Sequence, residues 1–316
     1  MSNKENRFFS FAVIFFVYCS ACAVGLTVFM LCAKMQTSFL LGIAAADIAA
    51  TIWTFIWSLV FKNSSVYDPY WSFAPWVMLI GTMVYAYIEK GFIAPWAWVL
   101  FALLSFWSWR LTGNWAVNFS NLTSQDWRYT LFKNKAPKLW FVTNFFGIHL
   151  MPTLVVFFAS VPLFYGATFY IDNYESLPLF LGLLPYTALP GALMCISAVL
   201  VQIIADAQML KFRKNPLNNG KVNSSGIWNH VRHPNYLGEI LMWWGIYLTS
   251  LAVCTMGGSR AMPVWAFAGA FANTLLFIFI SVPLMEKRQL QRRDDYKDYM
   301  KHTGALLPKF SKDSDW

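Results

Sequence analysis

The densest group of residues that could do chemistry surrounds a predicted helix start. Arg232 and His233 precede Pro234, and proline suits the first turn of a helix because its missing N–H costs nothing there. Asn235 and Glu239 then fall one turn apart on a single helical face. The helix dipole favours an anion at this end, and Arg232 and His233 add positive charge. The spacing therefore predicts a phosphate-binding site, and a chance run of these residue types is the weak alternative.

A second polar stripe lies at the end of the preceding apolar stretch. Gln202, Asp206, Met209 and Arg213 are spaced i, i+4, i+7 and i+11, so they share one helical face. Ionisable groups inside apolar helices are costly and normally face the bundle interior. We therefore predict a binding role for Gln202 and Asp206, and the structural alternative is an ion pair between Asp206 and Arg110.

A third stripe comprises Trp107, Arg110, Asn114 and Asn118, spaced i, i+3, i+7 and i+11. An arginine with two amides on the same face suits phosphate or ribose binding. The alternative is an arginine whose apolar stem lies in the bilayer while its charged end reaches the interface.

Asp68 stands directly before Pro69, at another predicted helix start. An aspartate at this position commonly caps the first turn. A catalytic role for Asp68 is the equally weighted alternative. Asp47 lies in an alanine-rich stretch suited to close helix contact, and we interpret it as a buried polar link between helices.

Composition predicts the elements that position these residues. The chain of 316 residues is 58% hydrophobic and 12% charged, whereas soluble domains average about 25% charged residues. A membrane helix needs about 20 mostly apolar residues. The fold class predicted is therefore an all-α polytopic membrane protein with about eight transmembrane helices. The segments are roughly 8–32, 39–61, 71–88, 92–113, 141–165, 178–210, 236–257 and 262–285.

The basic residues predict the orientation of these helices. Most of the 24 Lys and Arg residues fall in the segments that lie on the side of the N-terminus. Basic loops stay in the cytosol, so both termini are expected there. This bias accounts for much of the net charge of +9, and the remainder gathers near the polar stripes.

Several motifs together resemble the steroid 5-alpha-reductase superfamily, in particular its poorly characterised branch that shares the C-terminal steroid-reductase domain. The motifs are Tyr67–Trp71, Asp126–Tyr129, Ala205–Gln208, Lys214 with Pro216 and Gly220, Arg232–Glu239, Trp243–Gly245, Val282–Arg288, and Tyr296–Thr303 with Pro308. The resemblance covers roughly residues 39–310. It leaves residues 1–38 as an extra N-terminal transmembrane helix beside a seven-helix reductase-like bundle, and residues 311–316 as a tail.

The resemblance implies a membrane reductase that binds NADPH within the bundle and transfers hydride to the C=C bond of an α,β-unsaturated carbonyl lipid. It further implies a multi-pass protein of the endoplasmic reticulum. With the stripes above, the residues expected to bind the cofactor are Arg110, Asn114, Asn118, Gln202, Asp206, Arg213, Lys221, Arg232, His233, Asn235, Tyr236, Glu239, Arg288 and Arg292.

The resemblance also suggests catalytic residues. Asp68 falls near the family's catalytic glutamate, which polarises the substrate carbonyl together with a tyrosine. The position of that tyrosine is Trp107 here, and an indole N–H donates a hydrogen bond but does not serve as a proton donor. Tyr67 is the substitute we expect.

Two rival functions stay open. Membrane lipid and isoprenylcysteine methyltransferases, which use S-adenosylmethionine, also carry an Arg-His-Pro-x-Tyr motif. Asn235, Glu239 and the Asp206-x-Gln208 pair fit the reductase pattern better. The third possibility is a non-catalytic lipid-binding protein. The partners expected are the bilayer and a hydrophobic lipid, with no metal, no nucleic acid and a monomeric state.

Overall fold

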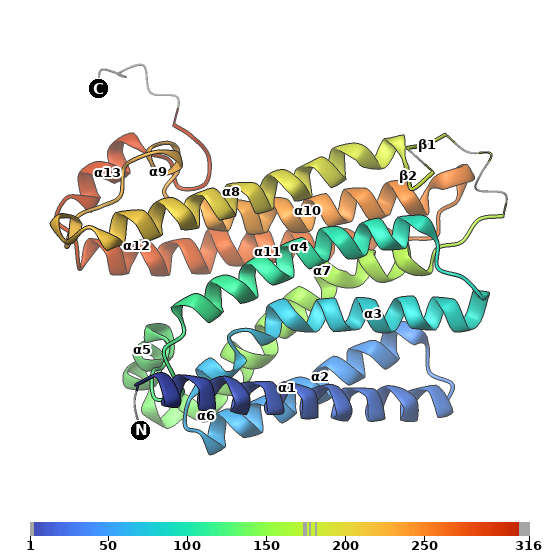
Figure 1. The fold of residues 1–316 in the computed structure, drawn as a ribbon, viewed down its shortest axis with the longest axis horizontal. Helices are drawn as coiled ribbons and strands as arrows, with labels where there is room; N and C mark the ends of the chain where they lie inside the picture. The colour runs from blue at the N-terminus through green and yellow to red at the C-terminus, as the bar shows by residue number, and fades with distance from the viewer. Residues whose placement is uncertain (1–2, 173–175, 177, 181, 310–316) are drawn as a thin grey trace. The chain divides into compact units, whose positions relative to one another are not determined.

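The computed structural model describes residues 3–172, 176, 178–180 and 182–309. Contacts divide the chain into two compact units (Figure 1). Unit 1 comprises Met1–Ile93 and Ser108–Thr168, and unit 2 comprises Ala94–Trp107 and Phe169–Trp316. The predicted division at residues 38 and 310 is a matter of family resemblance and stays a prediction.

Unit 1 is built from long apolar helices. They are α1 (Asn3–Lys34), α2 (Phe39–Val60), α3 (Tyr70–Lys90), the second part of α4 (Pro95–Asn118), α5 (Trp127–Lys135), α6 (Trp140–Val142) and α7 (Met151–Thr168). A 3-10 turn at Ser64–Tyr67 precedes α3, and a π-helix at Thr143–Leu150 leads into α7.

Small residues bring α1 and α2 together. A Cβ atom added to Gly25 would lie 3.2 Å from the carbonyl oxygen of Ala46, so glycine permits a close approach of the two backbones. Figure 1 shows the two helices running side by side. The Tyr70 hydroxyl donates to Asp47 Oδ1 at 2.8 Å, which confirms Asp47 as a buried link between helices, here α2 and α3.

Unit 2 contains the first part of α4, then α8 (Leu189–Lys214), α9 (Ile227–His230), α10 (Pro234–Cys254), α11 (Ala268–Leu276), α12 (Val282–Leu290) and α13 (Tyr296–His302). A π-helix at Phe277–Ser281 joins α11 to α12. Strands β1 (Leu179–Phe180) and β2 (Leu184–Pro185) pair antiparallel, with Leu179 opposite Pro185. The helix predicted to begin near residue 178 therefore begins only at Leu189, because Gly182 has a positive φ of 70° and the chain turns there.

Helices α8 and α10 are in especially close contact through glycines. A Cβ atom on Gly245 would lie 2.6 Å from Cys195 Sγ and 2.8 Å from the Gly191 carbonyl oxygen. We expect Gly245→Ala to lower the free energy of unfolding by about 1–3 kcal/mol, the usual cost of overpacking. Thermal unfolding in detergent would measure it. Gly147→Ala is the control, because its nearest neighbour would be Thr143 Cγ2 at 3.9 Å, and equal melting of the two variants would contradict this packing.

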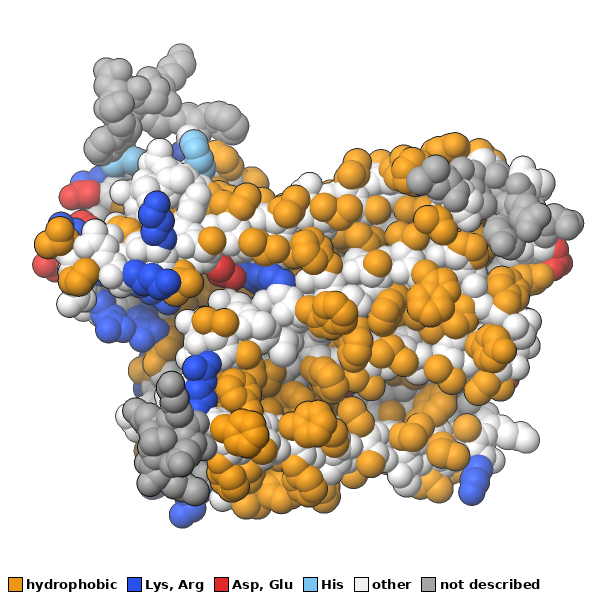
Figure 2. All heavy atoms as spheres, in the orientation of Figure 1, with side chains coloured by type: hydrophobic (Ala, Val, Ile, Leu, Met, Phe, Trp, Pro, Cys, Tyr) orange, Lys and Arg blue, Asp and Glu red, His pale blue; other side chains and the backbone are white. Residues whose placement is uncertain are grey.

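Seven helical stretches within the described residues are long and apolar enough to cross a membrane, which confirms the all-α polytopic fold. They are Asn6–Lys34, Phe39–Val60, Ser64–Lys90, Pro137–Thr168, Tyr186–Lys214, Pro234–Cys254 and Val264–Leu290. The remaining predicted segment, 92–113, is also helical, as α4, but the polar stripe there makes it less apolar. Large hydrophobic side chains cover the outer helical faces in Figure 2, as expected where helices meet lipid.

Candidate functional site

Glu239 is the centre of a polar cluster in unit 2. Its Oε1 accepts a hydrogen bond from Gln202 Nε2 on α8, and its Oε2 accepts one from Trp107 Nε1 on α4, both at 2.9 Å. Glu239 is 5% exposed and the other two side chains are fully buried. Buried carboxylates are stabilised by such donors. Gln202 and Trp107, predicted from separate motifs, thus both donate to the carboxylate of Glu239, which was predicted from a third motif.

Asn235 extends the cluster by one helical turn. Its Nδ2 donates to Asp206 Oδ1 at 2.6 Å, and its main-chain oxygen accepts from Gln202 Nε2 at 3.2 Å. The two predicted stripes on α8 and α10 therefore face each other. Gly238 permits this, because a Cβ atom there would lie 2.4 Å from Gln202 Cγ.

Asn235 also contributes an acceptor that lacks a donor among the described residues. Asn235 Oδ1 is buried and receives no hydrogen bond from the described part of the chain. A buried unsatisfied acceptor is costly, so a ligand with an N–H or O–H group would be stabilised there. Carboxamide and ribose hydroxyl groups of a dinucleotide meet this requirement. The residues present therefore fit the cofactor that the resemblance implies.

The side chains of Arg232 and His233 make contacts to other residues of the chain. Arg232 donates to Glu286 Oε1 from Nη2 at 2.6 Å and from Nε at 2.8 Å, and Nη1 donates to the Thr303 main-chain oxygen. His233 Nε2 lies 3.2 Å from the same Glu286 oxygen. Both basic side chains are more than nine-tenths buried. These contacts give Arg232 and His233 a structural role at the start of α10, and their binding of a cofactor phosphate stays a prediction. Tyr236, predicted alongside them, stacks on His233 with ring centroids 5.3 Å apart.

Two other predicted basic residues, Arg213 and Arg292, lie close to Arg293 in unit 2. Burial lowers the pKa of Arg293, and the neighbouring charges of Arg213 and Arg292 lower it further. Lys221 is exposed and Arg288 is half-buried. Figure 2 shows Lys and Arg side chains gathered over the end of unit 2 that carries α9, α12 and α13. Like charges held this close repel one another, and an anion would relieve the repulsion.

In unit 1, Asp68 lies at a second polar site. It lines a cavity of about 320 Å³ with Asn114, Asn118 and Arg128. Of these four residues, Asp68, Asn114 and Asn118 were predicted as site residues. Tyr129 donates its hydroxyl to Asp68 Oδ1 at 2.5 Å. Burial raises the pKa of Tyr129 well above its ordinary value, and the charge of Asp68 acts in the same direction. Tyr129 therefore stays protonated and remains a donor to Asp68.

One interpretation of this segment needs correction. Asp68 does not cap α3: Pro69 precedes the first residue, Tyr70, and no side chain caps the helix. The carboxylate bonds Tyr129 instead. Tyr67 does not line the Asp68 cavity. Its hydroxyl lies 2.8 Å from Thr153 Oγ1, and its ring is 4.7 Å from that of His149. The catalytic role of Tyr67 stays a prediction.

Arg110, Asn114 and Asn118 lie along the second part of α4, as their spacing predicted. Asn118 Nδ2 donates to Asn114 Oδ1 at 3.1 Å, which shows that the two amides share a face. Asn118 is exposed and Arg110 is half-buried. Their binding of a cofactor, and the ion pair between Arg110 and Asp206, stay predictions.

Sequence reasoning missed Tyr129 as the partner of Asp68 and Glu286 as the partner of Arg232. Each pair is more than fifty residues apart in the chain, so no helical spacing could reveal it. The available signal was weak: both residues lie in motifs that carry the family resemblance.

Comparison with known proteins gives the family. The model of a family described as "Protein of unknown function (DUF1295)" matches residues 54–303. An uncharacterized Schizosaccharomyces pombe protein, C594.04c, is 23% identical over 293 residues, which cover 86% of this chain and 78% of that protein. No solved structure matches the chain. Helix α1 and most of α2 lie outside the matched range.

Proposed function

Since the chain belongs to the DUF1295 family, and its motifs resemble the steroid 5-alpha-reductase superfamily, we propose that it is an NADPH-dependent membrane reductase. Its substrate would be a lipid that carries an α,β-unsaturated carbonyl group. The protein would lie in the endoplasmic reticulum membrane as a monomer, with both termini in the cytosol.

The observation that carries this proposal is the Glu239 cluster. Gln202, Asp206 and Asn235 are held in place by Glu239 and by one another. Asn235 Oδ1 remains as a buried acceptor. The positive charge of Arg213, Arg292 and Arg293 suits the phosphates of a dinucleotide. NADPH carries one more phosphate than NADH, so this charge favours NADPH.

Each residue has a defined part in the proposed reaction. When bound, NADPH supplies a hydride to the β-carbon of the enone. Asn235 and Asp206 would hold the cofactor by hydrogen bonds, while Glu239 and Trp107 position Gln202 and α10. Asp68, as a protonated carboxyl group, would donate a hydrogen bond to the carbonyl oxygen, where negative charge develops. A proton from water would then be added to the α-carbon and complete the reduction.

Equilibrium binding of NADPH to the purified protein in detergent tests the cofactor assignment. We expect Glu239→Ala and Asp206→Ala each to weaken binding at least about tenfold, since each removes a hydrogen bond to a charged group worth roughly 1.5–3 kcal/mol. Asp298→Ala is the control, because Asp298 is exposed on α13 and pairs with Lys301.

Two results would overturn the assignment. If Glu239→Ala and Asp206→Ala both bind NADPH as tightly as the wild-type protein, the cluster is not the cofactor site. If the wild-type protein binds S-adenosylmethionine and not NADPH, the methyltransferase alternative replaces the reductase.

A further inference from the structure

A second cavity lies wholly within unit 1, between α1, α2 and α3. It measures about 340 Å³, which is within the range of small-molecule sites. Helix α1, which forms one of its walls, lies outside the residues matched by the family. We propose that this cavity binds a neutral lipid with a single hydroxyl group, independently of the reductase function.

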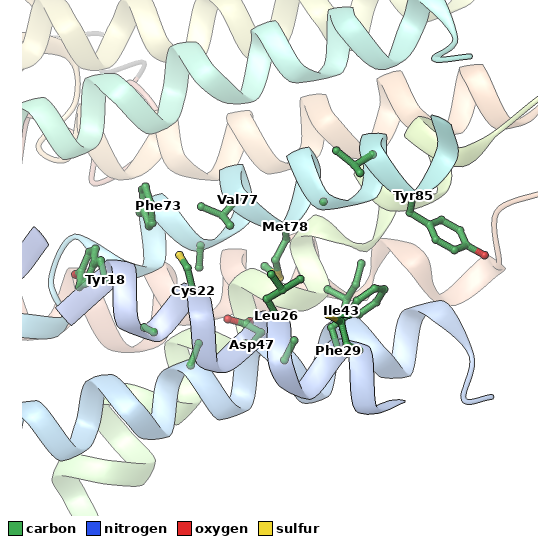
Figure 3. Close-up of a pocket in the computed structure, with 18 of the residues that line it drawn as sticks. Tyr18, Cys22, Leu26, Phe29, Ile43, Asp47, Phe73, Val77, Met78 and Tyr85 are labelled. Atoms are coloured by element: carbon green, nitrogen blue, oxygen red, sulfur yellow. The ribbon is translucent and has the colours of Figure 1, made fainter. Parts of the chain in front are cut away.

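Asp47 is the feature that indicates a ligand. Its side chain is only 5% exposed and lines the cavity. Tyr70 donates to Oδ1 at 2.8 Å and to the Asp47 main-chain oxygen at 3.2 Å, and within the described residues no hydrogen bond reaches Oδ2. Figure 3 shows Asp47 midway along the cavity, between Cys22 and Leu26, with Tyr18 and Phe73 towards one end and Tyr85 at the other. A carboxylate in apolar surroundings is costly when one of its oxygens has no donor, so a hydroxyl donor in the cavity would stabilise Asp47.

The remaining lining residues define the class of ligand. Asp47 is the single charged side chain among them, and they include no Lys, Arg or His. An acidic lipid would meet Asp47 without a compensating cation, so its binding is disfavoured. Leu26, Phe29 and Met78 provide apolar surface for a hydrocarbon body. Because all three helices are long and apolar enough to span a membrane, the ligand would enter from the bilayer.

Photolabelling tests this site directly. The probe is an alkyne-tagged sterol with a photoreactive diazirine and a free hydroxyl, added to the full-length protein in lipid nanodiscs. We expect labelled peptides from α1 to α3. Gly81 lines the cavity, and a Cβ atom there meets no atom within 4 Å. Gly81→Leu should therefore fill the cavity without strain and reduce labelling about tenfold.

Two further variants separate occupancy from folding. Gly147→Leu is the matched control, since Gly147 is exposed, lies outside the cavity and has its nearest neighbour at 3.9 Å; its labelling should equal that of wild type. Asp47→Asn keeps the side-chain shape but replaces an acceptor oxygen with an amide, and should reduce labelling about tenfold, the effect of one lost hydrogen bond to a charged group.

Competition distinguishes the sources of the hydroxyl. Unlabelled cholesterol or hexadecanol should displace the probe. Better competition by cholesterol would identify the ligand as a sterol, and better competition by hexadecanol would identify it as a fatty alcohol. Their methyl ethers should not displace it. Equal competition by the ethers, unchanged labelling of Gly81→Leu, or equal loss in Gly81→Leu and Gly147→Leu would each overturn the site. NADPH binding should be unaffected in the Gly81 variant, so failure of this proposal is distinct from failure of the reductase assignment.

Discussion

Replacing Arg232 with alanine is expected to lower the free energy of unfolding by about 3–5 kcal/mol, the usual cost of removing one partner of a buried ion pair. Arg232 and Glu286 side chains are 7% and 15% exposed. The same guanidinium also donates to the main-chain oxygens of Met300 and Thr303. Loss of Arg232 would remove the guanidinium donor from the Thr303 oxygen and leave Glu286 with the His233 contact alone, while the Met300 oxygen would keep Lys309 as a donor. Thermal unfolding in detergent and protease cleavage within α13 would measure the effect.

Arg232→Lys separates charge from geometry. Lysine keeps the positive charge but cannot reach Glu286 and Thr303 with a planar fork, so we expect an intermediate loss of stability. Arg128→Lys provides the matched comparison, because the Arg128–Asp126 pair is also at 2.8 Å but Arg128 is 44% exposed. An exposed pair contributes about 0–1 kcal/mol. Similar melting of Arg232→Ala and wild type would show that this cluster does not stabilise unit 2.

Replacing Asp68 with alanine is expected to lower turnover about 10²–10³-fold, as is typical when one hydrogen-bond donor to a developing oxyanion is lost. NADPH affinity should not change, because Asp68 lies outside the Glu239 cluster. The measurement is NADPH oxidation with a steroid enone as probe substrate, in single-turnover and steady-state modes. Asp68→Asn retains a donor and should recover part of the rate.

Tyr129→Phe completes this test. It removes the hydroxyl that holds Asp68 Oδ1 at 2.5 Å but leaves the carboxyl group in place, so the rate should fall less than in Asp68→Ala. Wild-type turnover in Asp68→Ala would exclude Asp68 from the chemistry. It would leave the NADPH assignment intact, because the two proposals rest on different residues.

Most helices could be predicted because membrane insertion imposes a simple rule of length and apolarity. Pro234 was predicted to start a helix, and α10 begins there. The sequence did not reveal the hairpin of β1 and β2, because Leu179, Phe180 and Leu184 read as a continuation of the apolar run that follows. The π-helix at Phe277–Ser281 also has no distinct signal in an apolar sequence.

The candidate site was predicted in part, for a geometric reason. Helical spacing placed Asn235 and Glu239 on one face, and Gln202 and Asp206 on another. It could not show that these faces meet, since that depends on the close packing of α8 and α10 around Gly238. Asp68 was singled out as a rare acid near an apolar segment, but its partner depends on a loop contact with Tyr129, and the predicted helix cap was wrong.

The pairing of residues 231–233 with residues 303–305 has a consequence for biosynthesis. The main-chain N–H groups of Arg232 and His233 donate to the carbonyl oxygens of Gly304 and Ala305 at 2.8 and 3.0 Å. While the ribosome is still translating α12, helices α8 and α10 can already have entered the membrane, yet the start of α10 has none of these partners. A chain truncated between residues 290 and 303 would therefore insert into the membrane and contain the Glu239 cluster. Its residues 231–233 would lack their main-chain partners, which would make the truncated protein a target for membrane quality control.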